Sequence, residues 1–165
     1  GISAAAGIRT SAEMPQIIAD LRERTALMAR YASVKARYCR LLDTKDWSGF
    51  AGLLTEDFEL DVSEGTSVPV IHGRDAAVTQ IRSSMASART AHQVHSPEIT
   101  LDGANRAQVI WAMQDRVVWG EEQAARIGRA GLTGYGHYHE RYVKQDGEWK
   151  IAALRLTRLH IDMHA

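Results

Sequence analysis

The sequence has one cysteine, three prolines and no excess of charge of either sign. Cys39 cannot form a disulfide within the chain, which agrees with a reducing compartment. Lysine and arginine together number 20, as do aspartate and glutamate, so no net field favours nucleic acid or an anionic membrane as a partner. No apolar run approaches the ~20 residues of a membrane-spanning helix. We therefore expect a cytoplasmic protein that binds neither nucleic acid nor membrane.

The length of 165 residues predicts one domain, large enough to enclose a small pocket. We place this domain at residues 14–165. Residues 1–13 include several small residues, but they lack the basic start and apolar core of a signal peptide. We expect them to be a disordered end or a remnant of cloning.

The first half of the chain predicts helices. From about residue 14 to residue 42, apolar and aromatic residues recur every three or four positions, which indicates one buried stripe on a helix. Residues 46–54 predict a short second helix with Asp46 as its N-cap. After short strands at 58–62 and 70–73, a third helix is expected over residues 74–88.

The second half predicts a sheet. Four long segments have strand character: 90–101, 106–119, 134–145 and 149–162. Strands of this length suit a strongly curved, mostly antiparallel sheet. The polar, glycine-rich stretch 120–133 predicts a long hairpin loop or a flap over a pocket. Helices followed by a sheet indicate an α+β fold, with the helices packed in the concave face of the sheet.

Two charged residues interrupt apolar strand faces. Between residues 107 and 119 every second residue is apolar except Asp115, and Arg155 is the charged member of the face that runs from Trp149 to Ile161. A carboxylate on an apolar face needs partners or must stay protonated, and both situations are typical of active sites. The alternative is a structural ion pair between Asp115 and Arg155 or another arginine.

Several segments and their spacing carry a family resemblance: ARYCRLLDTKDWSGFAGLLTEDFELDV, IHGRDAAV, TAHQVHSPEIT, WAMQDRV and GYGHYHERYVKQDGEWKIAALRLTRLH. They resemble the SnoaL-like branch of the nuclear transport factor 2-like superfamily, which also holds scytalone dehydratase, bile acid 7-alpha-dehydratase and ketosteroid isomerase. The resemblance covers roughly residues 17–162. It implies a cone-shaped fold, a hydrophobic small-molecule ligand, a homodimer or higher homo-oligomer, and catalysis that needs no cofactor.

The resemblance also suggests site residues. Similar proteins place an aspartate at the end of the first helix against a histidine on the strand after the third helix, and Asp43 and His92 match these positions. Dehydratases with a tyrosine five residues before that aspartate, and a second aspartate 23 residues after that histidine, match Tyr38 and Asp115. An arginine on the last strand recurs, and Arg155 is the nearest match, with Arg158 as the alternative.

Together these groups could perform acid–base chemistry. A carboxylate bonded to one imidazole nitrogen fixes the tautomer and raises the basicity of the other nitrogen, so His92 is expected to be a general base oriented by Asp43. Tyr38 or a protonated Asp115 could donate a hydrogen bond to developing negative charge or protonate a departing hydroxyl. The competing interpretation is that His92 and Tyr38 are ordinary core residues.

Further residues are expected to line the pocket, although an aromatic stripe can equally be core. They are Tyr31, Trp47, Trp111, Met113 and His137. His137 and His139 stand two apart on one strand, a spacing that can bind metal, but no cysteine or carboxylate cluster completes a site. We expect no metal.

The sequence thus predicts a cofactor-independent lyase of the dehydratase type, or an isomerase or cyclase. Its expected substrate is a hydrophobic, cyclic, oxygenated small molecule such as a steroid or polyketide. Two alternatives remain: a non-catalytic small-molecule-binding or scaffold domain, and the small subunit of a ring-hydroxylating dioxygenase.

Overall fold

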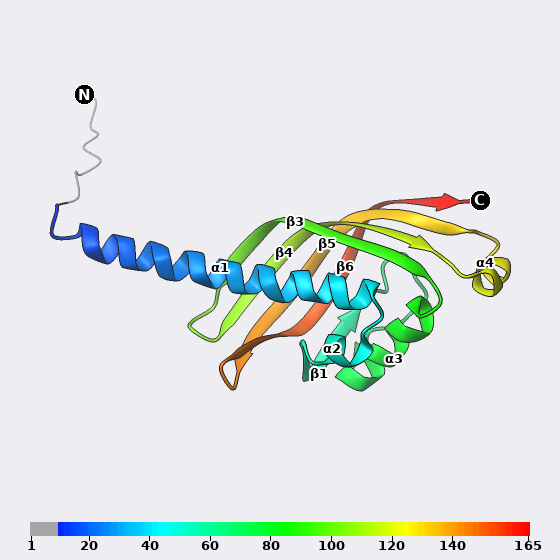
Figure 1. Cartoon of the computed structure of the whole chain (residues 1–165), viewed down its shortest axis with the longest axis horizontal. Helices are drawn as coiled ribbons and strands as arrows, with labels where there is room; N and C mark the ends of the chain where they lie inside the picture. The colour runs from blue at the N-terminus through cyan, green and yellow to red at the C-terminus, as the bar shows by residue number, and fades with distance from the viewer. Residues whose placement is uncertain (1–9) are drawn as a thin grey trace, which may run out of the picture.

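The computed structural model describes residues 10–165, and it begins with a long helix that leads into a sheet (Figure 1). Helix α1 spans Met14–Asp43 with Pro15 in its first turn, and all its fully buried residues lie between Tyr31 and Leu42. Its N-terminal half extends beyond the sheet. Residues 1–9 lie outside the described residues. They belong to the segment that was expected to be disordered.

Six strands form one curved sheet in the order β2-β1-β6-β5-β4-β3. Their bounds are β1 Leu54–Asp61, β2 Ile71–His72, β3 Arg89–Leu101, β4 Arg106–Val118, β5 Gly131–Gln145 and β6 Glu148–His164. Strands β1 and β6 are parallel, and the other neighbours are antiparallel. The expected α+β class and curved sheet are confirmed, with α1 packed across the concave side of the sheet (Figure 1).

Two short helices connect α1 to the rest of the fold. Helix α2, Trp47–Ala51, begins as expected after Asp46, whose carboxylate accepts a hydrogen bond from the Gly49 N–H at 2.9 Å. Helix α3, Arg74–Met85, follows β2 and packs against β1. These two helices, together with the end of α1, surround one end of the sheet.

Residues 120–133, expected to form a long hairpin loop or a flap over a pocket, do connect the antiparallel strands β4 and β5, but part of this connection is helical. Residues Glu121–Ile127 form helix α4, and β5 already begins at Gly131. The two glutamates that begin α4 complement its dipole, and Gly128 ends it in the left-handed conformation with φ 76°. The stretch is therefore an ordered helical connection between β4 and β5.

A β-bulge decides which residues of β6 face the core. Ile151 pairs with Tyr142 and Ala153 with Arg141, so Ala152 has no partner across the strands. One extra residue reverses the alternation of side chains. Downstream of the bulge Leu154 and Leu156 are therefore buried and Arg155 is exposed. The face predicted from strict alternation is correct up to Ile151 and reversed from Leu154 to Arg158; a second unpaired residue, Leu159, restores it, so that Ile161 lies on the same face as Asp115.

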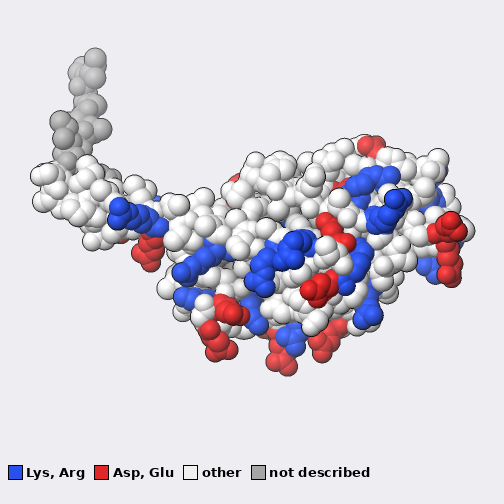
Figure 2. All heavy atoms as spheres, viewed as in Figure 1, with Lys and Arg blue, Asp and Glu red and all other residues white. Residues whose placement is uncertain are grey.

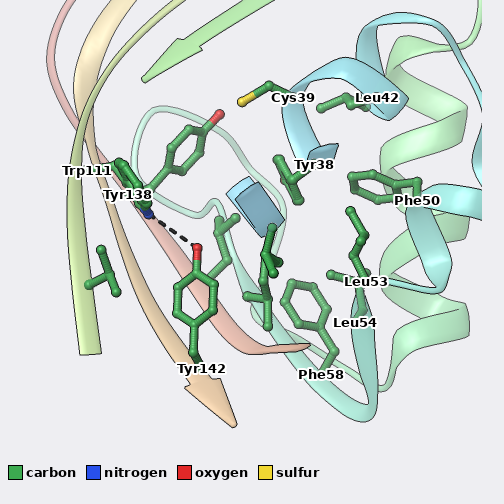
Figure 3. Packing of buried hydrophobic residues seen from close by; sticks show 14 of the residues in the cluster. Tyr38, Cys39, Leu42, Phe50, Leu53, Leu54, Phe58, Trp111, Tyr138 and Tyr142 are labelled. Atoms are coloured by element: carbon green, nitrogen blue, oxygen red, sulfur yellow. Dashed lines mark hydrogen bonds between the residues drawn. The ribbon is translucent and has the colours of Figure 1, made fainter. Parts of the chain in front are cut away.

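The core fills the space between α1 and the sheet, and it is rich in aromatic rings (Figure 3). Tyr31 packs against Tyr142 and Trp149 with ring centroids 5.5 and 4.9 Å apart, and Tyr38 packs against Phe50 at 4.8 Å. This cluster fixes the C-terminal half of α1 against the strands. It thereby sets the position of the residues at the end of α1.

Candidate active site

A cavity of about 160 Å³ lies where the end of α1, helix α3 and the sheet meet. Its polar lining residues are Tyr38, Thr66, Gln80, Ser84, His92, Asp115, Tyr138 and Arg158, and its apolar ones are Leu42, Leu60, Val62, Val68, Ile81, Met85, Leu154 and Leu156. Apolar walls with a few convergent polar groups are typical of small-molecule sites.

Asp43 and His92 are in direct contact, as the sequence predicted. Asp43 is the last residue of α1, and its Oδ1 lies 2.6 Å from His92 Nδ1. Its Oδ2 accepts a hydrogen bond from the backbone N–H of His92 at 2.8 Å. His92 lines the cavity, while Asp43 stands behind it. With the proton on Nδ1, the other ring nitrogen is left free to accept a proton.

A hydroxyl and an ammonium group extend this contact. Thr90 Oγ1 donates to Asp43 Oδ1 at 2.8 Å and accepts from Lys45 Nζ at 2.8 Å. Burial opposes ionisation of Asp43, but the hydrogen bonds from His92 and Thr90 outweigh it and hold the pKa of the carboxyl below its usual value. Asp43 is thus an anion that orients His92.

Asp115 is paired with an arginine, but not with Arg155. Arg158 Nη1 and Nη2 donate to the two Asp115 oxygens at 2.6 and 2.9 Å. Although burial opposes the charge, this contact raises the pKa of the guanidinium. The expectation that Arg155 faces the pocket is wrong, because the bulge at Ala152 turns it outward and places Arg158 inside. Both oxygens of Asp115 accept from Arg158, so this carboxyl group is placed to hold the guanidinium rather than to donate a hydrogen bond.

A glycine on β5 makes room for this pair. Gly134 lies directly opposite Asp115 in the sheet, and a Cβ atom there would overlap both Arg158 Nη1 and Asp115 Oδ1. Together with the bulge in β6, this glycine lets the two side chains reach the cavity wall side by side. The sequence shows that residue 134 is a glycine, but it does not show that the missing side chain leaves room for Asp115 and Arg158.

Two phenols line the cavity from opposite sides. Tyr38 comes from α1 and Tyr138 from β5, and their ring centroids lie 6.3 Å apart. Burial raises the pKa of both hydroxyls well above the usual value, with a smaller contribution from Glu140 at Tyr38 and from Tyr38 at Tyr138. Both are therefore neutral hydrogen-bond donors. Tyr138 was not predicted, although it lies on the same strand face as the buried Glu140 and Tyr142.

The five residues expected to form the pocket wall lie elsewhere. Tyr31 belongs to the aromatic core, and Trp111 donates to the Tyr142 hydroxyl at 3.3 Å within the same core (Figure 3). His137 lies on the strand face opposite Tyr138 and outside the cavity. Trp47 packs against the ring of Phe50.

Met113 is also buried behind the cavity, 3.9 Å from Arg158 Nη1 through its sulfur. The actual apolar wall comes from the end of α1, from α3, from β1 and the segment that follows it, and from β6. Val62 continues the alternation of Phe58 and Leu60, which could have marked it, whereas Val68 lies in a loop segment that periodicity cannot assign to a pocket. The residues of α3 do share a helix face, which periodicity could have identified.

Two further properties follow from the described part of the chain. Within residues 10–165, no three histidine, cysteine, aspartate or glutamate side chains gather so that they could hold a metal ion. In the same range, no helix is both long and apolar enough to cross a membrane.

Comparisons with known proteins agree with this architecture. The family model described as SnoaL-like domain matches residues 19–155. The "Probable cyclase FGR4" of Gibberella zeae is 25% identical over 134 residues, which are 76% of this chain and 87% of that protein.

Two solved structures are similar in fold. A scytalone dehydratase candidate from Novosphingobium aromaticivorans has a TM-score of 0.74 and 22% identity, covering 86% of this chain and 90% of that one. A type 2 hexachlorocyclohexane dehydrochlorinase has a TM-score of 0.73 and 16% identity, covering 88% and 93%. Because the family model matches well over half of the sequence, the chain belongs to the SnoaL-like domain family.

Proposed function

We propose that this protein is a cofactor-independent lyase of the dehydratase type, or a related cyclase or isomerase, that acts on a hydrophobic oxygenated small molecule. One observation carries the proposal: His92, held by Asp43 at 2.6 Å, faces a cavity that also contains two neutral phenols. The names of the relatives, a probable cyclase and a scytalone dehydratase candidate, point to the same kind of chemistry.

The first step is removal of a proton from a carbon next to a carbonyl group. His92 takes the proton on its free ring nitrogen, and the C–H electron pair moves into the carbonyl to give an enolate. Asp43 stabilises the imidazolium that forms. The hydroxyls of Tyr38 and Tyr138 donate hydrogen bonds to the enolate oxygen, where the negative charge develops.

The second step is loss of the hydroxyl group. The enolate electrons return to form a carbon–carbon double bond, and the C–O bond breaks as the leaving oxygen takes a proton from the His92 imidazolium. Water departs and the base is regenerated, so no other reactant is consumed. Isomerisation follows the same path, except that the proton is returned to a different carbon.

Arg158 is the only arginine among the described residues that line the cavity. Because Asp115 holds two of its N–H groups, the guanidinium is fixed in place and partly neutralised. In the proposal Arg158 orients a substrate oxygen, and Asp115 acts through Arg158 rather than as an acid. The family resemblance suggested that Asp115 donates a hydrogen bond or a proton to the substrate, whereas here it holds Arg158 in place.

The cavity favours a compact substrate. Its volume of about 160 Å³ lies below the ~300–1,000 Å³ typical of sites for drug-sized ligands. A ring system of one or two rings with a carbonyl and a hydroxyl group fits this space better than a four-ring steroid. We therefore favour a polyketide-like compound as the substrate class.

Proton abstraction can be tested before the substrate is known. Cyclic hydroxyketones of one and two rings are incubated with the protein in D₂O, and exchange of the hydrogens next to the carbonyl is followed by NMR. His92→Ala should slow the exchange by about 10²-fold or more, because the general base is lost. His95→Ala is the matched control, since His95 lies on the same strand but points outward.

Equal exchange rates for the native protein and His92→Ala would contradict the proposal. So would an equal loss of activity in His92→Ala and His95→Ala. Circular dichroism of each variant distinguishes the loss of the base from the loss of the fold.

A further inference from the structure

A fully buried ion pair lies beside the cavity. Lys35 Nζ is 2.6 Å from Glu140 Oε1, and both side chains are 0% exposed. Burying two charges is costly, and well-packed apolar residues in place of a buried pair are often neutral or stabilising. The requirements of stability therefore do not explain why a charged pair occupies this position.

The pair contacts the two phenols that line the cavity. Lys35 Nζ lies 3.8 Å from the ring centroid of Tyr38 and 3.8 Å from that of Tyr138, so the ammonium is held between the two ring faces. Figure 3 shows these rings entering the core from α1 and from β5. A cation within ~6 Å of a ring centroid is attracted to the ring face.

The sequence positions explain this geometry. Lys35 stands one helical turn before Tyr38 on α1, and Glu140 stands two residues after Tyr138 on the same face of β5. Neither Lys35 nor Glu140 is among the described residues that line the cavity. The tyrosines, not the pair itself, would therefore contact a bound molecule.

The carboxylate is anchored to the sheet. Tyr142 donates its hydroxyl hydrogen to Glu140 Oε2 at 3.1 Å and accepts a hydrogen bond from Trp111 Nε1 at 3.3 Å. This chain of contacts joins β4, β5 and α1. It fixes Glu140, which in turn fixes the ammonium between the rings.

We propose that Lys35 and Glu140 are positioning residues for the reaction: together they hold the rings of Tyr38 and Tyr138 so that both hydroxyls face the substrate oxygen that becomes negative. The inference rests on the proposed function and extends it to a pair that does not touch the substrate. Because the two charges oppose each other, the pair acts by orientation rather than by a net field. Both phenols remain protonated, as donation requires.

The test compares binding of an anionic and a neutral probe. 4-Nitrophenolate presents an oxygen anion of the kind that the two hydroxyls would bind, and nitrobenzene is its neutral counterpart without that oxygen. The variant is Lys35→Met combined with Glu140→Gln, which leaves the net charge unchanged and retains an acceptor for Tyr142. We expect at least about tenfold weaker binding of 4-nitrophenolate. Nitrobenzene should bind within about twofold of native, with little change in Tm.

Two further variants serve as controls. Tyr38→Phe should reproduce the selective loss for the anion, because it removes one donor. Tyr31→Phe should change neither affinity, because Tyr31 lies in the same aromatic cluster but away from the cavity. Neither probe loses a proton on binding, so the result does not depend on His92 acting as a base.

The inference is overturned if the double variant binds both probes like the native protein, or if it loses both affinities equally. It is also overturned if the native protein does not prefer 4-nitrophenolate to nitrobenzene. If the double variant does not fold, Lys35→Met with Glu140→Leu replaces it. Failure of both to fold would make the pair a structural requirement and would contradict the inference.

Discussion

Asp43 contributes to stability as well as to the site, because its carboxylate receives three hydrogen bonds. Its pKa lies below the usual value: burial raises it, but the bonds from His92 and Thr90 outweigh this effect. A lowered carboxyl pKa stabilises the fold above the unfolded-state pKa of about 3.9, and the stabilisation is lost as the pH falls through the lower, folded-state value.

The contribution of Asp43 to stability should therefore depend on pH. The Tm advantage of the native protein over Asp43→Asn should be largest above about pH 4 and should shrink as the pH falls further. Thermal unfolding followed by circular dichroism between neutral pH and strong acid measures it. Asp75→Asn is the control, since its carboxylate is exposed. A constant Tm difference across the whole range would contradict the role given to these hydrogen bonds.

Arg158 and Arg155 of β6 should contribute very differently to stability. Arg158→Ala leaves Asp115 buried and unpaired, and removing one partner of a buried pair typically costs about 3–5 kcal/mol. Arg155→Ala should cost less than about 0.5 kcal/mol, because that side chain is exposed. Urea unfolding gives both values. If the two variants were equally stable, the assignment of Arg158 to the cavity wall would be wrong.

Single residues differed in how far the sequence revealed them. Asp43 and His92 were predicted because family spacing and their place at element ends both marked them. The apolar pattern of α1 does not mark Lys35 as buried, although Lys35 stands four residues after Tyr31 and three before Tyr38. Its burial depends on Glu140, which lies about one hundred residues further along the chain, and helix periodicity cannot reveal such a partner.

At the scale of elements, the helices and long strands were predicted to within a few residues because their periodicity is strong. The faces of β6 were not, since the bulge at Ala152 reverses them and strict alternation gives no sign of it. Helix α4 was missed because its glycine-rich surroundings indicate a loop. The error at Arg155 followed directly from the undetected bulge.

The two halves of helix α1 should differ in how readily they open. Its residues 14–30 include none that is fully buried, whereas the buried residues of its second half pack on the sheet. Amide hydrogen exchange should therefore be at least about tenfold faster in residues 14–28 than in residues 34–42, because few tertiary contacts oppose opening there. Mass spectrometry of peptic fragments measures the difference. Uniform protection along α1 would show that the first half has a partner.

For the molecule as a whole, the balanced composition is visible on the surface. Basic and acidic side chains are interspersed on the face drawn in Figure 2. The homo-oligomer and the cytoplasmic location expected from the sequence stay predictions. The cavity of this protein gathers an imidazole held by a carboxylate, two phenols, and an arginine held by a second carboxylate.

The tautomer of His92 tests the central claim most directly. Nitrogen-15 NMR of the imidazole rings at neutral pH, with His92→Gln to assign the signal, identifies which nitrogen carries the proton. The contact with Asp43 predicts that the neutral ring carries its proton on Nδ1 and leaves Nε2 free, with a shift toward the other tautomer in Asp43→Asn. A native His92 that is protonated on Nε2, or that is unaffected by Asp43→Asn, would contradict the claim that Asp43 prepares His92 to accept a proton.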